Sequence, residues 1–391
     1  MARRDLVLVV VILALLATAG VLFVLVRQRP QPEEAEADTS RAQPAPVAGS
    51  PVADIGSGGA FDGGWYQLYF TAPKYPDNPA NHRGGIDERL VQLMDRAQRT
   101  LDVADYDFDL ANVADAMVRA KQRGVTVRMV TDGDTVRNTR QQAIQDAFGK
   151  LKRAGIPVVD DGERQAIMHN KFTVVDGEWV ETGSWNYTDG DTYRLNNHAI
   201  VIRSRELAAN YTAEFNKMFE KKQFGASKDR AVPNPTVTID GTRVETCFAA
   251  EGKCADRIVA TLNGASRSIQ FLAFSFTSDK IAAPMLAKAK AGLPVSGVFE
   301  TTGSNTSFSE YGKMKRQKLD VYQDGNPWVM HHKVIIVDER IVIFGSFNFS
   351  DNADKDNDEN LLIVDNPEMA RAFKAEFDRV LALAKNPPAK K

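Results

Sequence analysis

The sequence is poor in cysteine and has no excess of positive charge. Its 391 residues include only two cysteines, Cys247 and Cys254, which excludes a disulfide-rich scaffold and a cysteine-based zinc cluster. These two could pair in an oxidising compartment or remain free thiols. Lysine and arginine number 49 against 51 aspartates and glutamates, which excludes a broadly basic nucleic-acid binder. Any anion-binding site must therefore be a local cluster.

Enough apolar residues are present for a substantial core. The chain is 43% hydrophobic and 26% charged, so global disorder is excluded. A chain of this length suits two domains, or one large domain built from a repeated half.

One long apolar run lies near the N-terminus. The 21 residues from Leu6 to Val26 carry no charge and are flanked by arginines. At about 1.5 Å per residue, this run matches the ~30 Å hydrocarbon core of a bilayer. We predict that residues 1–27 form a single-pass transmembrane anchor in the cell membrane, with the globular part outside the cytoplasm. The alternative is a cleaved signal peptide and a secreted form, because residues 17–19 (Ala-Thr-Ala) fit a cleavage site.

Residues 28–60 are rich in proline, alanine and glutamate, the composition of a flexible linker. The remainder of the chain is internally repeated, with Gly124 and Gly292 at equivalent positions. In the first copy, helices and strands are expected over 89–99, 101–108, 114–123 and 125–132. In the second copy, they are expected over 258–265, 268–274, 281–291 and 295–300.

This alternation indicates a mixed α/β sandwich in each half. We therefore predict two domains, over 61–225 and 226–391, with a site at the interface between them. Apolar residues at helical spacing also predict a closing amphipathic helix over 367–384.

Each half carries the pattern HxKxxxxDxxxxxxGSxN once. The residues that match it are His169, Lys171, Asp176, Ser184 and Asn186 in the first half, and His331, Lys333, Asp338, Ser346 and Asn348 in the second. Because strand side chains alternate, the histidine and lysine of each copy share one face. The aspartate falls in the turn of a hairpin, where we expect it to stabilise the turn. Imidazole, ammonium, hydroxyl and amide groups on one patch suit a phosphate group.

The two motifs resemble the HKD motifs of the phospholipase D superfamily, and the resemblance extends from about Tyr66 to Leu383. It implies duplicated mixed-sheet α/β sandwich domains that meet across a pseudo-two-fold axis in one active site. It also implies a two-step phosphodiester exchange without metal or cofactor. One histidine attacks phosphorus to give a phosphohistidine, and the other protonates the leaving oxygen and later activates water or an alcohol.

The copies differ 28 residues after each motif histidine, where the family tends to place a carboxylate. The first copy has Asn197 at this position and the second has Glu359. If each residue orients the histidine of its own copy, the carboxylate raises the pKa of His331, and His169 keeps an amide partner. We therefore expect His169 to be the nucleophile and His331 the general acid.

Phospholipid hydrolysis at a membrane is the function that the sequence favours, in a monomer whose halves form one site. A nuclease acting on DNA or RNA and a cardiolipin synthase-like phosphatidyltransferase are the enzymatic alternatives. A decayed phosphate-binding module is the non-enzymatic one, and two intact motifs argue against it. Basic clusters at 150–153 and 313–316 either flank a groove or form solvated helix faces.

The remaining titratable candidates are expected to have no catalytic role. His82, His198 and His332 are predicted to be structural or surface groups. The acidic run 351–359 resembles a calcium loop but lacks its glycine.

Overall fold

The computed structural model describes residues 60–137 and 140–388. The predicted anchor 1–27 and the linker up to residue 59 lie outside these ranges. Among the helices that are described, none combines the length and apolar character needed to cross a bilayer. Residue 60, the last of the predicted linker, already belongs to the first strand.

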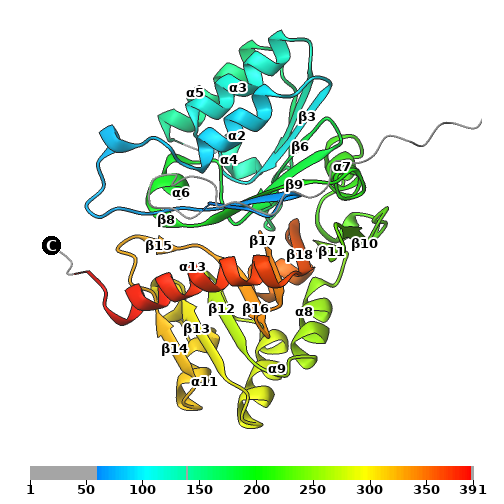
Figure 1. Cartoon of the computed structure of the whole chain (residues 1–391). Helices are drawn as coiled ribbons and strands as arrows, with labels where there is room; N and C mark the ends of the chain where they lie inside the picture. Colours follow the sequence, from blue (N-terminus) through cyan, green and yellow to red (C-terminus); the bar gives the residue numbers. More distant parts are fainter. Residues whose placement is uncertain (1–59, 138–139, 389–391) are drawn as a thin grey trace, which may run out of the picture. The chain divides into compact units, whose positions relative to one another are not determined.

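The first half is built on an eight-stranded mixed sheet of order β1-β2-β9-β7-β6-β3-β4-β5 (Figure 1). Its strands are β1 (Ala60–Asp62), β2 (Tyr66–Phe70), β3 (Thr100–Asp105), β4 (Thr126–Thr131), β5 (Val158–Asp160), β6 (Lys171–Val175), β7 (Trp179–Gly183) and β9 (His198–Arg203). The pairs β3–β4 and β4–β5 are parallel, which requires crossover connections.

The second half repeats this sheet strand for strand, in the order β10-β11-β18-β17-β16-β12-β13-β14. Its strands are β10 (Thr236–Ile239), β11 (Thr242–Ala249), β12 (Ile269–Ala273), β13 (Val295–Phe299), β14 (Asp320–Gln323), β16 (Lys333–Val337), β17 (Ile341–Gly345) and β18 (Glu359–Asp365). The identical order confirms the duplicated mixed α/β architecture that the repeat predicts.

Helices supply the crossovers and cover the sheets. In the first half they are α2 (Ile86–Asp95), α3 (Ala111–Gln122), α4 (Gly133–Arg137), α5 (Gln142–Arg153), α6 (Asp189–Tyr193) and α7 (Arg205–Phe219). In the second half they are α8 (Cys254–Asn263), α9 (Asp279–Lys290), α10 (Thr301–Ser304), α11 (Glu310–Arg316), α12 (Asp351–Lys355) and α13 (Pro367–Lys385). Helix α13 is the predicted closing helix, and it lies along the second sheet (Figure 1).

Within residues 60–137 and 140–388, three apolar cores hold these layers together. One lies between the first sheet and helices α2, α3 and α5, and another between the second sheet and helices α8, α9 and α11. The central core draws on both sheets and on α7 and α13. Here the ring of Tyr211 from the first half packs 5.2 Å from that of Phe248 in the second. Strands β6 and β16 are buried along their whole length, which explains their nearly continuous apolar sequences.

Two short links also join the halves. Strand β8 (Leu195–Asn196) pairs in parallel with β15 (Val329–Met330). An equivalent bridge joins Met168 and Asp358. Each link precedes a motif histidine, so both histidines enter the seam between the halves. Between β11 and the start of α8, Cys247 and Cys254 form a disulfide, which resolves the pairing that the sequence leaves open.

Candidate active site

Both motifs form the predicted hairpins. Strand β6 pairs with β7, and β16 with β17. The turns place two successive residues at positive φ, at Asp176 (54°) and Gly177 (64°) in the first and at Asp338 (57°) and Glu339 (53°) in the second. This is the backbone of a type I′ hairpin turn, whose twist matches that of the flanking strands.

The motif aspartates stabilise these turns, as predicted. The carboxylate of Asp176 accepts hydrogen bonds from the backbone N–H groups of residues 98–100. Asp338 does the same with residues 266–268. Each aspartate therefore ties its hairpin to the start of the neighbouring strand, and its carboxylate is occupied there.

The backbone of each motif histidine is held by the opposite half. The N–H of His169 donates to the carbonyl of Asp358 at 3.0 Å, and the N–H of His331 donates to that of Asn196 at 2.9 Å. These reciprocal contacts place the two imidazoles in corresponding positions along the seam.

The expected pairing of each histidine with the residue 28 positions later is wrong, because the pairing crosses between the halves. His169 Nδ1 lies 2.8 and 2.9 Å from the two carboxylate oxygens of Glu359. His331 Nδ1 lies 3.0 Å from the amide oxygen of Asn197. Glu359 therefore orients His169, and Asn197 orients His331. From the sequence, the roles of nucleophile and general acid are assigned by pairing within each copy, and the structure shows the opposite pairing.

The motif serines show how this crossing is built. Ser184 Oγ donates to Asn197 at 2.8 Å, and Ser346 Oγ donates to Glu359 at 2.6 Å. Each serine thus holds the partner residue of its own half, and the same oxygen of that residue, Asn197 Oδ1 or Glu359 Oε2, contacts the histidine of the other half. The sequence predicts these hydroxyls as phosphate donors, whereas the structure gives them a positioning contact.

A second carboxylate, that of Asp191, lies next to His331, and the sequence does not predict it. Asp191 Oδ1 lies 3.3 Å from His331 Nδ1 and accepts hydrogen bonds from the Asn186 and Asn197 side chains, each at 3.1 Å. Burial acts to raise the pKa of Asp191, but its interaction with the His331 ring, the hydrogen bond from the Asn186 N–H and the nearby Lys171 outweigh burial and lower that pKa. The repeat gives no signal for Asp191, because Ala353 stands at the equivalent position.

Each motif lysine folds back on its own histidine. Lys171 Nζ donates to the carbonyl of His169 at 2.9 Å, and Lys333 Nζ donates to that of His331 at 2.7 Å. Aromatic rings cover both ammonium groups. Tyr106 lies 5.3 Å from Lys171 Nζ, and Phe274 lies 4.6 Å from Lys333 Nζ. The two rings occupy equivalent places in the repeat, just after β3 and β12, which is the signal that could have identified them.

The charges of the site favour an anion and keep both imidazoles neutral in the free protein. Burial, together with the charges of Lys171 and Lys333, holds the pKa of His169 well below its usual range. Burial and Lys333 lower the pKa of His331 to about 3. Burial raises the pKa of Glu359 to about 8, against the opposing effect of Lys171. The two histidines are only 5% and 6% exposed, so little of either ring is accessible to solvent.

The motif asparagines complete the site. Asn186 Nδ2 donates to Asp191. The side-chain oxygens of Asn186 and Asn348 are buried without a hydrogen-bond partner among the described residues. Among residues 60–137 and 140–388, no group of three or more histidine, cysteine or acidic side chains is arranged to hold a metal ion.

The other candidates are structural. His198 and His332 stack with ring centroids 5.3 Å apart, and their Nδ1 atoms lie 3.1 Å from each other. His332 also pairs with Glu376 at 2.9 Å. In the acidic run, Asp354 accepts from a backbone N–H of α8, and Asp358 pairs with Lys228.

Comparison with known proteins agrees with the geometry. Residues 90–219 and 258–381 match the family described as "Cardiolipin synthase, PLD-like domain". The chain therefore belongs to the phospholipase D superfamily of phosphodiesterases, with one PLD-like segment in each half.

Several curated proteins and solved structures are similar to parts of the chain. A phospholipase D of Rickettsia prowazekii is 28% identical over 41% of this chain and 79% of its own length. A mitochondrial cardiolipin hydrolase of Xenopus tropicalis is 33% identical over 39% and 76%. A phospholipase D of Rickettsia conorii is 33% identical over 34% of this chain, which spans 66% of that protein's length. The phosphatidylserine synthase of Haemophilus influenzae, at 13% identity and a TM-score of 0.60, covers 76% of this chain and 84% of its own, and shares the fold.

Proposed function

We propose that the protein is a phospholipase D-type enzyme that hydrolyses a phospholipid phosphodiester through a phosphohistidine intermediate. The observation that carries the proposal is the seam between the halves. There, two neutral imidazoles have Nδ1 held by a partner from the opposite half, next to two buried ammonium groups. Because Nδ1–H is donated to that partner, Nε2 of each ring is free to act on a substrate.

His169 is the nucleophile in this proposal. Its Nε2 attacks phosphorus and the bond to the leaving oxygen breaks, which leaves a positive ring that the Glu359 carboxylate stabilises at 2.8 Å. Lys171 and Lys333 neutralise the charge that builds on the phosphoryl oxygens. The sequence also predicts His169 to be the nucleophile, and the contact of its ring with the Glu359 carboxylate supports this role.

His331 is the acid and then the base. Its pKa of about 3 belongs to the free protein and already includes the raising effect of Asp191, and a bound phosphodiester anion raises it further. The protonated ring donates to the leaving alcohol and later takes a proton from water, whose oxygen attacks the phosphohistidine and returns His169 to its free form.

A lipid substrate is supported by the relatives and by the charge distribution. The relatives named above are called phospholipase D and cardiolipin hydrolase. Both predicted basic clusters are partly neutralised, since Lys150 pairs with Asp115 at 2.6 Å, and Lys313 pairs with Asp279 and Glu310. This is typical of solvated helix faces rather than of a nucleic-acid groove.

We also propose that the protein acts at the membrane outside the cytoplasm. The run from Leu6 to Val26 supports an anchor. The Cys247–Cys254 disulfide supports an oxidising compartment.

The proposal is tested with the full-length chain in mild detergent, with His169→Ala as the inactive control. The enzyme is assayed side by side on phospholipid vesicles and on single- and double-stranded nucleic acids at about 0.15 M salt, where charges are screened beyond about 8 Å. Release of the lipid head group that exceeds nucleic-acid cleavage, and that His169→Ala abolishes, is expected. Rapid cleavage of single-stranded DNA or RNA with inert vesicles would show a nuclease instead.

A further inference from the structure

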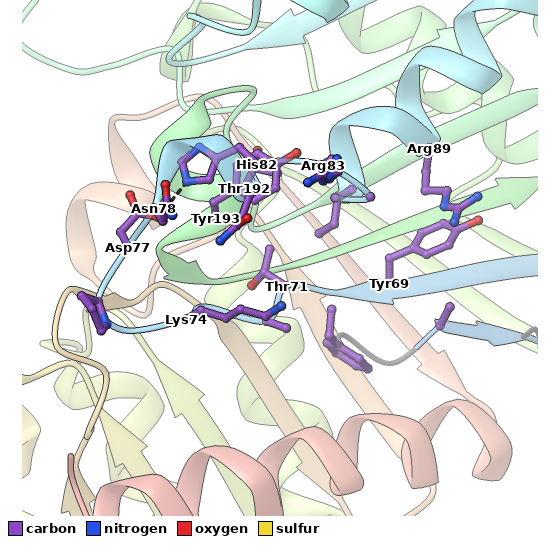
Figure 2. A pocket seen from close by; sticks show the side chains of 18 residues that line it. Tyr69, Thr71, Lys74, Asp77, Asn78, His82, Arg83, Arg89, Thr192 and Tyr193 are labelled. Atoms are coloured by element: carbon purple, nitrogen blue, oxygen red, sulfur yellow. Dashed lines mark hydrogen bonds and ion pairs between the residues drawn. The ribbon is translucent and has the colours of Figure 1, made fainter. Parts of the chain in front are cut away.

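A separate cavity of about 200 Å³ lies beside helix α6, between the start of α2 and the loop that follows β2 (Figure 2). It is several times larger than the ~30 Å³ that one water occupies in the liquid. The mechanism above uses none of the side chains that line it.

Three cationic side chains, Lys74, Arg83 and Arg89, line this cavity. Figure 2 shows them spaced around it, with Arg89 beside Tyr69. Within the described part of the chain, no ion pair joins any of the three to a carboxylate. Arg89 Nε is buried without a hydrogen-bond partner, and its Nη1 has one long contact with Gln92, at 3.4 Å. Unpaired arginine donors around a cavity fit the oxygens of a phosphate group.

The acidic side chain that lines the cavity and its neighbour Asp189 are paired with other residues, whereas Asp87 and Glu88, behind the wall, accept hydrogen bonds from the Tyr193 hydroxyl and the Gly84 N–H. Asp77, the carboxylate in the cavity wall, pairs with His82 Nε2 at 2.7 Å and with Arg194 at 3.4 Å. Asp189 pairs with His82 Nδ1 at 2.8 Å. His82 in turn stacks on Tyr193, with centroids 4.2 Å apart. The lining therefore keeps an excess of positive charge, and His82 holds the cavity wall in place.

The cavity shares a wall with the active site. Thr71, which lines the cavity, accepts a hydrogen bond from the Asn197 N–H at 2.7 Å, and the Asn197 side chain orients His331. Thr192 and Tyr193 line the cavity from α6 and directly follow Asp191, the carboxylate at His331. A ligand group here lies on the His331 side of the site, where the leaving alcohol departs.

We propose that Lys74, Arg83 and Arg89 form a second anion subsite. It takes a phosphate-like or other anionic group of the lipid next to the scissile phosphodiester, and it selects anionic lipids over zwitterionic ones. This inference rests on the proposed lipid function and adds to it that the preferred lipids are anionic.

The test compares Lys74→Gln/Arg83→Gln with a matched control, Lys290→Gln/Arg316→Gln. The control removes the same two charges from exposed positions remote from the cavity in the sequence. Each protein hydrolyses vesicles of phosphatidylcholine alone and vesicles of phosphatidylcholine with cardiolipin, whose second phosphate supplies the second anion. We expect wild type and control to prefer cardiolipin, and the cavity variant to lose at least tenfold of that preference in kcat/KM. Cleavage of bis(p-nitrophenyl) phosphate, which has no second anion, should be unchanged.

A second measurement does not depend on lipid hydrolysis. Calorimetric titration with inorganic pyrophosphate should show one more binding event in wild type and control than in the cavity variant. If wild type hydrolyses no lipid, the proposed function fails, and this titration alone decides whether the anion subsite exists. Equal pyrophosphate binding in all three proteins, or an unchanged lipid preference, would overturn the subsite. An effect confined to oligonucleotide cleavage would overturn its assignment to lipids.

Discussion

Replacing Glu359 by glutamine tests the crossed pairing of the catalytic histidines. In the structure this carboxylate holds His169, the proposed nucleophile, at 2.8 and 2.9 Å. If it held His331 instead, as pairing within one copy predicts, it would act on proton donation to the leaving group. A substrate whose leaving group needs no proton distinguishes the two arrangements.

The size of the effect follows from burial and bond type. Glu359 is fully buried, so solvent does not screen its interaction with the ring. A hydrogen bond to a charged group contributes about 1.5–3 kcal/mol, against about 0.5–1.5 kcal/mol for a neutral one. The difference of about 1–2 kcal/mol corresponds to roughly a 5- to 30-fold slower phosphorylation of His169.

The assay is a rapid-mixing burst with a p-nitrophenyl phosphodiester, combined with detection of the phosphorylated protein. Glu181→Gln is the matched control. Glu181 is also a buried carboxylate, but it lies in the first half and accepts a hydrogen bond from Tyr187. We expect Glu359→Gln to slow the burst and Glu181→Gln to leave it unchanged. A burst within twofold of wild type in Glu359→Gln, with slow turnover only of lipids that have poor leaving groups, would refute the crossed assignment.

Four further outcomes are expected. With the p-nitrophenyl substrate, kcat/KM should rise as pH passes through about 8, because the ionised Glu359 is the hydrogen-bond acceptor, and a profile unchanged by Glu359→Gln would contradict this. Burial raises the pKa of Glu181 from 4.5 to about 8, so stability falls as pH rises across that window. Glu181→Gln should then stabilise the fold above pH 8 by up to about 5 kcal/mol but not at pH 4, as thermal unfolding at both pH values would show. Activity should persist in excess chelator, whereas restoration by added calcium or zinc alone would revive a metal mechanism. The full-length chain should remain in membranes after alkaline washing at its unprocessed mass, and a soluble product beginning at Gly20 would instead show signal cleavage.

The local structure of the site was predictable because it is encoded by spacing along the chain. Each lysine lies two residues after its histidine, at the start of β6 or β16, and reaches back to that histidine's carbonyl, and a positive-φ turn follows from Asp176-Gly177. The aspartates stabilise these turns because the turn residues lie next to the start of a neighbouring strand. The repeat likewise predicted the identical strand order of the two sheets.

The partners of the histidines could not be predicted in the same way. Asn197 and Glu359 lie at equal distances from their motifs, but that spacing does not show which half each side chain faces. The parallel link between β8 and β15 decides this, and it joins segments more than 130 residues apart. The sequence does not predict Asp191 on α6, because the second copy has no carboxylate at the equivalent position. A contact made by one copy alone leaves no trace in a comparison of the two.

The reciprocal serine–partner–histidine contacts have an evolutionary consequence. In a homodimer of a single half, both histidines would face the same residue, and every substitution would change both at once. Joining two copies in one chain frees the two positions to diverge, and here they hold an amide at 197 and a carboxylate at 359. A duplication within one chain thus allows the partner of each histidine to be tuned separately.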